Sequence, residues 1–311
     1  MGWAQTAGNS ASHATLWNGT TVTDLGTLGG TDSYAQGINA SGMVVGFSRI
    51  TGDSNYRATV WNGTTASALA TLGGNGDSFA AAVNASGLTV GDSYITGNTA
   101  SHATLWNGTT VTDLGTLGGS NSQAVGVNNS GLVVGMSQIV GNSASHATLW
   151  NGTSATDLGT LGGSGSQAFA INSSGQIVGS SETTGNVGND PFLYTGGTMY
   201  DLNSLLNPGA GVTNLALDIA FGGDVINDLG QIAAVGTING ETEALLLTPT
   251  AVPEPCTVFF GIALCGLAVL HRRRNVSSPP PVLQGDRMAL GIGQGSDFQI
   301  GRNVDVWKSE F

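Results

Sequence analysis

The sequence predicts an all-β protein, and more narrowly a β-propeller made of four-stranded repeats. The first observation is a phrase, Asp-Leu-Gly-Thr-Leu-Gly-Gly, found at Asp24–Gly30, Asp113–Gly119 and Asp157–Gly163, with a degenerate copy at Ala68–Gly74. The second is an aromatic residue ahead of each copy, recurring every 44 or 45 residues. The third is that no segment before Cys256 has the apolar period of a helix. The aromatic residues are Trp17, Trp61, Trp106, Trp150 and Tyr194.

Each repeat is expected to form four strands. The first two are separated by Asn-Gly, as at Asn18-Gly19, the strongest short signal for a hairpin with a type I′ turn. The last two are separated by a polar turn, Asn39–Gly42. Gly46 lies inside the fourth strand, which predicts a bulge or the close approach of another backbone. In the first repeat the strands are His13–Trp17, Thr21–Leu25, Tyr34–Ile38 and Met43–Ser48.

The repeat domain is expected to span residues 1–249, with five full units and partial strands at its ends. The last strand of a unit, Met1–Ala7, and a first strand, Glu243–Thr248, could complete one sheet between them. Because Met1–Ser10 aligns with Val134–Ser143 inside a repeat, we expect further strands and a signal peptide upstream. The alternative is a cytoplasmic protein, since the sequence shows no secretory signal. The alternative fold is a β-solenoid, which would require splitting each repeat into two unlike halves.

Charge excludes one class of function. The chain carries a net charge of −12. The residues before Cys256 include sixteen acidic residues and only two basic ones, Arg49 and Arg57. Such a surface does not neutralise phosphates, so nucleic-acid binding is not expected. Both cysteines, Cys256 and Cys265, lie outside the repeats, so no cysteine-based metal site is expected within them.

Histidine and aspartate recur at fixed positions but do not predict a metal site or a cofactor. His13, His102 and His146 share their position with Arg57, Asp190 and Glu243 in the other units, which is typical of a solvated position. The aspartates that open the repeated phrase are expected to bond nearby backbone. The formal glycosylation sequons occupy turns that need asparagine for their backbone, which favours a structural role: Asn18, Asn39, Asn62, Asn84, Asn107, Asn128, Asn151 and Asn172.

Catalysis is not expected from this pattern. Residues 11–30 and 100–119 are identical, whereas a catalytic centre needs unlike residues that converge on one point. If one exists, the divergent fifth unit, with Asp218, Asp224 and Asp228, is the place to look.

Residues 1–249 resemble the HAF-repeat family of exported bacterial proteins. The repeated phrase, Asn-x-Ser-Gly-x-Val-Val-Gly and the closing Asp201–Leu206 match, although Thr replaces Phe in the triplet that names the family. The resemblance implies a surface or secreted repeat protein and carries no established chemistry.

Residues 250–274 resemble the PEP-CTERM sorting signal. Val252, Pro253, Glu254 and Pro255 precede an uncharged stretch, Cys256–Leu270, and Arg272, Arg273 and Arg274 follow it. The resemblance implies removal by a membrane protease, exosortase, although here a tail of low complexity, residues 275–311, continues beyond the arginines. Independently, we expect residues 256–270 to form a short transmembrane helix, with the arginines on the cytoplasmic side.

The sequence therefore predicts a non-catalytic protein of the cell surface or extracellular matrix, anchored in the membrane and then cleaved. Many similar faces at a fixed spacing would bind extracellular polysaccharide or surface proteins through avidity. The alternative is a polysaccharide-active propeller enzyme, a hydrolase or lyase, that uses the centre of the ring.

Overall fold

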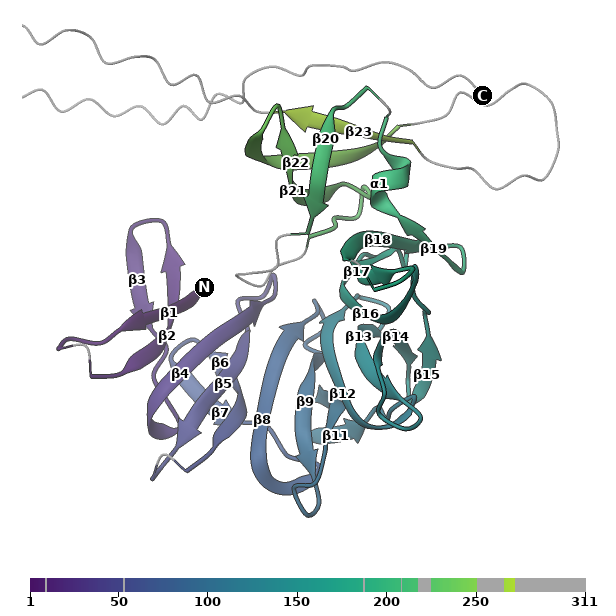
Figure 1. The fold of residues 1–311 in the computed structure, drawn as a ribbon. Coiled ribbons are helices and arrows are strands. Elements are labelled where there is room, and N and C mark those ends of the chain that lie inside the picture. Colours follow the sequence, from purple (N-terminus) through teal and green to yellow (C-terminus); the bar gives the residue numbers. More distant parts are fainter. Residues whose placement is uncertain are drawn as a thin grey trace, which may run out of the picture.

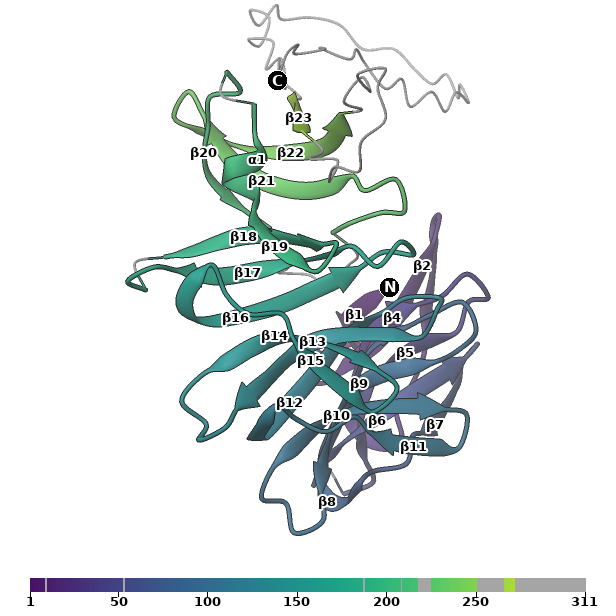
Figure 2. The same ribbon diagram turned by 90° about the vertical axis from the view of Figure 1, so that its right-hand side faces the viewer.

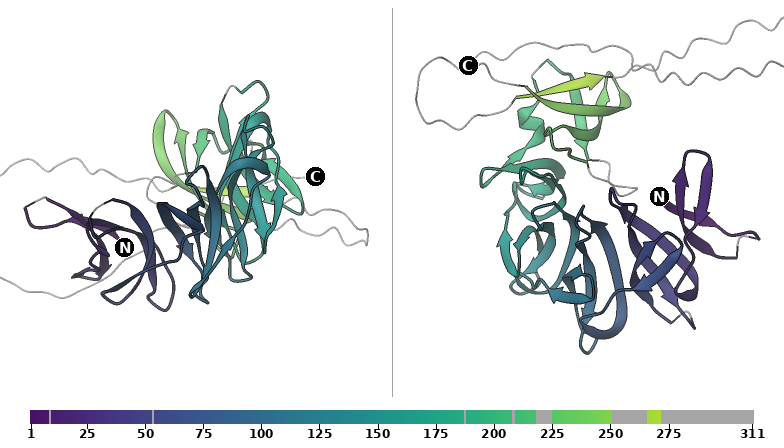
Figure 3. Two further views of the ribbon diagram at one scale, coloured as in Figure 1. Left: turned by 90° about the horizontal axis from the view of Figure 1, so that it is seen from below. Right: turned by 180° about the vertical axis from the view of Figure 1, so that it is seen from behind.

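The protein is all-β, as the sequence predicts. A computed structural model describes residues 1–8, 10–52, 54–186, 188–207, 209–217, 225–250 and 266–271. Over these residues six small antiparallel sheets follow one another in chain order along an arc (Figure 1). The view from behind places the N-terminal sheet and the last sheet at the two ends of the arc (Figure 3).

The sheets are numbered here in chain order. Sheet 1 contains β1 (Gly2–Gln5), β2 (Ser12–Asn18) and β3 (Thr21–Asp24). Sheet 2 contains β4 (Gly29–Ile38), β5 (Val44–Ile50), β6 (Tyr56–Asn62) and β7 (Thr65–Ala68). Sheet 3 contains β8 (Gly73–Val83), β9 (Thr89–Ile95), β10 (Ser101–Asn107) and β11 (Thr110–Asp113). Sheet 4 contains β12 (Gly118–Val127), β13 (Leu132–Ile139), β14 (Ser145–Asn151) and β15 (Ser154–Asp157).

Sheet 5 repeats this pattern, whereas sheet 6 comes after a short helix. Sheet 5 contains β16 (Gly162–Ile171), β17 (Ile177–Thr183), β18 (Asn189–Thr195) and β19 (Thr198–Asp201). Sheet 6 contains β20 (Val212–Ala216), β21 (Ile232–Ile238), β22 (Glu241–Thr250) and β23 (Gly266–His271). Between these sheets lies a short helix, α1 (Leu202–Leu205), which Figure 2 shows beside sheet 6. Asp201 caps α1 by accepting a hydrogen bond from the backbone N–H of Asn203.

The strands form where predicted, but they are grouped differently. Sheets 2 to 5 each join the last two strands of one repeat to the first two strands of the next, so β4 and β5 share a sheet with β6 and β7. The prediction that one repeat makes one sheet is therefore wrong. The two hairpin turns keep consecutive strands paired, whereas the link after Asp24 crosses to sheet 2, where Leu28 bridges Ile50.

The predicted pairing of the two terminal strands is also wrong. β1 pairs with β2 in sheet 1, and β22 pairs with β21 and β23 in sheet 6. Each terminal strand thus finds partners from its own end of the chain, because a hairpin brings neighbouring segments together at low entropic cost.

The predicted transmembrane helix is not formed in the part of residues 256–270 that the structure describes. From Gly266 the chain is the strand β23, whose backbone pairs with β22 from Leu245 to Thr250. Pairing with an available sheet edge satisfies backbone groups that a short apolar segment in water leaves open. Among the described residues no helix has the length and apolar character needed to cross a membrane. The sorting-signal residues 252–255 and 272–274, and the tail 275–311, lie outside the described residues.

The hydrophobic core lies between successive sheets. Trp61 of sheet 2 packs in one cluster with Ala14 and Leu25 of sheet 1, and the equivalent Trp106 and Trp150 also lie in clusters shared by two sheets. These three indoles are at most 1% exposed, whereas Trp17 in sheet 1 is 45% exposed because no sheet covers its face in this structure. Burying aromatic rings of this size contributes a large share of the stabilisation between sheets.

The predicted role of the strand glycines is confirmed. A Cβ on Gly46 would overlap the carbonyl oxygen of Tyr34, and Gly91, Gly135 and Gly179 are crowded in the same way. A bulge lies opposite, where the register of β4 shifts between Ala35 and Gly37. The glycines let the second strand of sheets 2 to 5 lie close against the first.

Candidate functional site

An asparagine begins the polar turn between the first and second strands of sheets 2 to 6. In sheet 2 the Oδ1 atom of Asn39 accepts hydrogen bonds from the backbone N–H groups of Ser41 and Met43, each at 3.1 Å. The same two bonds hold the turn at Asn84, where both distances are 3.0 Å. The prediction that these sequons serve their own backbone is confirmed at these positions.

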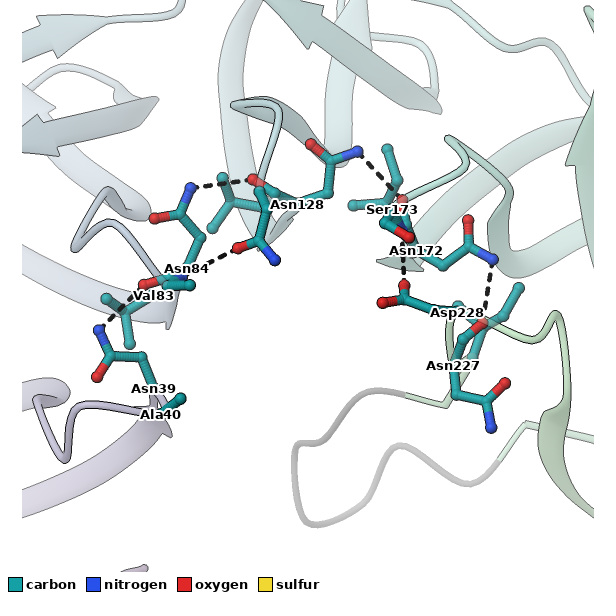
Figure 4. Close-up of a pocket in the computed structure, with 14 residues that line it drawn as sticks. Asn39, Ala40, Val83, Asn84, Asn128, Asn172, Ser173, Asn227 and Asp228 are labelled. Atoms are coloured by element: carbon teal, nitrogen blue, oxygen red, sulfur yellow. Dashed lines mark hydrogen bonds between the residues drawn. The ribbon is translucent and has the colours of Figure 1, made fainter.

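In sheets 2 to 5 the amide nitrogen of this asparagine reaches the next sheet, whereas that of Asn227 in sheet 6 donates to the side chain of Gln231. Figure 4 shows the Nδ2 atoms donating in series to the backbone carbonyl of the following asparagine. The four distances lie between 3.0 and 3.1 Å. One side chain therefore serves its own turn and the adjacent sheet. We name these residues the asparagine arc: Asn39, Asn84, Asn128, Asn172 and Asn227.

A second layer of bonds follows the same path. The backbone N–H of Ala85 donates to the Oδ1 atom of Asn129 at 3.0 Å, and that of Ser173 donates to Asp228 at 2.9 Å. These bonds to Ser173 hold the pKa of the Asp228 carboxyl below its usual range, against slight desolvation. Asp228 is thus ionised at neutral pH and places a negative charge beside Asn227, at one end of the arc.

The asparagine arc borders a cavity of about 370 Å³ (Figure 4). Its lining is formed by the arc, by the residue after each arc asparagine, and by apolar residues such as Val83, Val127 and Ile171. Among the lining residues that the structure describes, Asp228 is the one with an ionisable side chain. Side-chain amides form much of this lining, so it is suited to binding hydroxyl or amide groups.

The recurrent histidines and aspartates form pairs. The Nδ1 atom of His13 lies 2.8 Å from Asp24, and His102–Asp113 and His146–Asp157 have the same distance. Asp24 also accepts the backbone N–H of Gly26 at 2.8 Å, which confirms its predicted backbone bond. Sequence reasoning treated the two positions separately and missed the pairing; their constant separation of 11 residues was the available signal.

The pairing changes where the repeat diverges. In sheet 2 Ala68 replaces the aspartate, and Arg57 donates instead to the carbonyl of Gly76 at 2.6 Å. In sheet 5 both positions are acidic: burial, followed by repulsion from Asp201, raises the pKa of Asp190. Among the described residues, no three His, Cys, Asp or Glu side chains gather closely enough to hold a metal ion.

Of the three acidic residues singled out in the fifth unit, the structure describes one. Asp228 lines the cavity, while Asp218 and Asp224 lie outside the described residues. The asparagine arc was not predicted as a site, although the spacing of 44 residues between Asn84, Asn128 and Asn172 was visible. No protein-family model matches the chain, and no curated protein matches it in a sequence comparison.

Proposed function

We propose that the six sheets are blades of a β-propeller. The support is that each full sheet is a four-stranded antiparallel unit and that first strands of neighbouring sheets, such as β4 and β8, contact one another. The arc of asparagines at one end of these strands encloses the cavity, as the funnel of a propeller does. A β-solenoid is not favoured, because its coils pair in parallel whereas these sheets are antiparallel throughout.

The protein is a non-catalytic repeat protein that presents equivalent surfaces along its arc. One observation carries this proposal: the fourth strands β7, β11 and β15 lie at sheet edges and present hydroxyl-bearing residues to solvent at equivalent positions. Thr65, Thr110 and Ser154 occupy the same exposed position in these three strands. Copies of one weak contact on a rigid arc bind a repetitive polymer through avidity.

The protein is exported, and its partners are extracellular polysaccharide or surface proteins. The support is the resemblance of the repeats to the HAF-repeat family and of residues 250–274 to the PEP-CTERM signal. An exosortase-type protease recognises Val252–Pro255 and Arg272–Arg274. The mature body is then retained at the cell surface or released.

A polysaccharide-active enzyme is not proposed. Glycoside hydrolysis generally uses two carboxyl groups that flank the scissile bond, and Asp228 is the one carboxylate among the described residues that line the cavity.

Measurements of polymer binding and of glycan turnover distinguish a non-catalytic binding protein from a polysaccharide-active enzyme. The repeat protein is incubated with isolated cell-surface polymer and, in parallel, with a panel of glycans whose reducing ends are assayed. We expect retention on the polymer without turnover. Turnover that Asp228→Asn abolishes would overturn the proposal.

The intact mass of the released protein tests sorting. We expect a C-terminus close to Pro255 and a product without cysteine. Surface-located protein that still carries Trp307 would contradict processing.

A further inference from the structure

Five aromatic rings from three sheets form a connected patch outside the hydrophobic core. Trp3 meets Tyr34 with a centroid distance of 5.9 Å, Tyr34 meets Phe47 at 5.1 Å, and Phe47 meets Phe79 at 5.0 Å. Tyr56 contacts Phe47 at 5.3 Å. None of these rings belongs to the clusters that hold sheets 1 to 3 together. Trp3 is 53% exposed and the other four rings are partly exposed. We call these five residues the aromatic patch.

The repeat itself does not require these aromatic residues. By strand register Phe47 is equivalent to Asp92 in sheet 3, and Tyr56 is equivalent to Ser101. There the hydroxyl of Ser101 donates to Asp92 at 2.7 Å, and Gln123, the equivalent of Phe79, donates to the same carboxylate at 3.1 Å. A polar network therefore fills the same space in the next sheet, so the aromatic patch is a local departure from the repeat.

The two basic residues that precede Cys256 both border the aromatic patch. The guanidinium carbon of Arg49 lies 4.3 Å from the centroid of the Tyr56 ring, a cation–π contact. Arg49 also lies 3.6 Å from Asp32. Arg57 donates to the carbonyl of Tyr56 at 3.1 Å, and Asp77 accepts the backbone N–H of Tyr56 at 2.8 Å. Two cations and two acids thus surround the rings, and their formal charges balance.

The patch therefore offers one exposed ring, Trp3, and four partly exposed rings beside a balanced rim of charged donors and acceptors. A flat apolar face with a polar edge suits a sugar ring, whose C–H groups pack on an aromatic face while its hydroxyls bond the rim. The two acids and the acidic body disfavour an anionic ligand, and the same charge excludes nucleic acid. From these contacts we infer that the aromatic patch is a binding site for a neutral glycan chain.

This inference is separate from the proposal of repeated surfaces, because the patch occurs once and the fourth strands recur. Trp3, the most exposed ring, lies at one end of the series and provides the largest stacking surface. Arg49 and Asp32 provide charge-assisted hydrogen bonds to hydroxyl groups, which are stronger than neutral ones.

The test measures retardation in native gels that contain a soluble glycan, with the full chain as the sample. The neutral probes are hydroxyethyl cellulose, laminarin, galactomannan and dextran, and alginate is the anionic probe. We expect at least one neutral glycan to retard the protein and alginate to leave its mobility unchanged. Retardation by alginate alone, or by none of the five probes, would overturn the inference.

Variants then locate the site. Tyr56→Ser and Phe79→Gln introduce residues that equivalent strands already carry, so the fold tolerates them. Together with Trp3→Ala they should raise the dissociation constant at least ten-fold. Trp17→Ala is the matched control: Trp17 is in the same sheet and similarly exposed, but the register places it on the opposite face from Trp3. Equal losses in Trp17→Ala and Trp3→Ala, or unchanged binding in the two polar variants, would contradict the site.

The same variants distinguish the aromatic patch from the repeated surfaces of the fourth strands. Retention on cell-surface polymer that survives the patch variants would support the repeated surfaces and overturn the aromatic patch as the glycan site. Loss of retention in those variants would support the patch and overturn the repeated surfaces.

Discussion

The side-chain amide of Asn84 donates to the backbone carbonyl of Asn128, 3.0 Å away and 44 residues further along the chain. Both residues are buried, at 4% and 5% exposure, and both hold their own turns with the same side chain. A single residue type at one position thus fixes a local turn and the contact between two sheets. Replacing the amide separates these two roles.

Asn84→Asp keeps the oxygen that holds the turn but removes the donor to Asn128. We expect a loss of about 1–3 kcal/mol of unfolding free energy at pH 7, because a buried carbonyl loses its partner. Urea denaturation monitored by tryptophan fluorescence measures the change. Asn129→Ala is the control: its side chain is exposed, and it should lose less than about 1 kcal/mol. A loss in Asn84→Asp no greater than in this control would contradict the role of the asparagine arc.

Gly135→Ala places a methyl group against the carbonyl oxygen of Gln123. Because this oxygen belongs to the backbone of the paired strand, relief requires the two strands to separate. We expect a destabilisation of about 3 kcal/mol, measured as a lower midpoint of urea unfolding. Gly188→Ala adds the same methyl group where no atom lies within 4 Å, so it should stay within about 0.5 kcal/mol of wild type. Similar midpoints for the two variants would refute the close approach.

The buried tryptophans differ in their hydrogen bonds. The Nε1 atom of Trp106 donates to the carbonyl of Ala70 at 2.6 Å. The equivalent carbonyl for Trp61, that of Gly26, accepts the hydroxyl of Ser33 at 2.7 Å, and the Nε1 atom of Trp61 has no partner among the described residues. We therefore expect Trp106→Phe to destabilise the protein more than Trp61→Phe by about 1–2 kcal/mol. Thermal unfolding of the two variants provides the comparison, and a reversed order would contradict this assignment.

Asp24 and Asp190 should respond to pH in opposite directions. Partial burial raises the pKa of Asp24, but the hydrogen bonds from His13 and Gly26 outweigh it and hold that pKa below its usual value. Its contribution is therefore present above the unfolded pKa of about 4 and is lost as pH falls through the folded value. Burial and the charge of Asp201 raise the pKa of Asp190, so its ionised form weakens the fold as pH rises above about 4.

Two isosteric variants test this contrast. Asp24→Asn should lower stability at pH 7, and Asp190→Asn should increase it, each by about 0.5 kcal/mol because these groups face solvent. At pH 3 both differences should shrink. Urea midpoints at the two pH values measure them, and differences of the same sign at pH 7 would contradict the electrostatic assignment.

The repeated strands were predictable because their signals are local. Asn18-Gly19 predicts a hairpin whatever surrounds it, and the structure places β2 and β3 on either side of it. The grouping of strands into sheets was not predictable, because the link from Asp24 to Gly30 has no feature that distinguishes a turn within a sheet from a crossing between sheets. The apolar segment before His271 was predicted as a helix from its hydropathy, which does not report a free sheet edge nearby.

The candidate site was visible only in part. The spacing of Asn84 and Asn128 in sequence was clear, but the direction of their amides depends on how closely the sheets pack. The aromatic patch was harder to predict from the sequence, because Trp3 and Phe79 lie far apart in the chain and each is a residue type that is common in strands. Their contact with Tyr34 and Phe47 follows from the crossing of the chain between sheets.

The crossing between sheets also bears on how such a gene changes length. Residues 11–30 and 100–119 are identical, and each copy ends where the chain enters the first strand of a new sheet. Recombination between the two copies would remove residues 31–119 in frame, and with them sheets 2 and 3, while the joint kept its original sequence. Every remaining strand would retain its own partner. Such a shortened chain would lose four rings of the aromatic patch together with Arg49 and Arg57. One genetic step would therefore add or remove whole sheets and, with them, a glycan specificity.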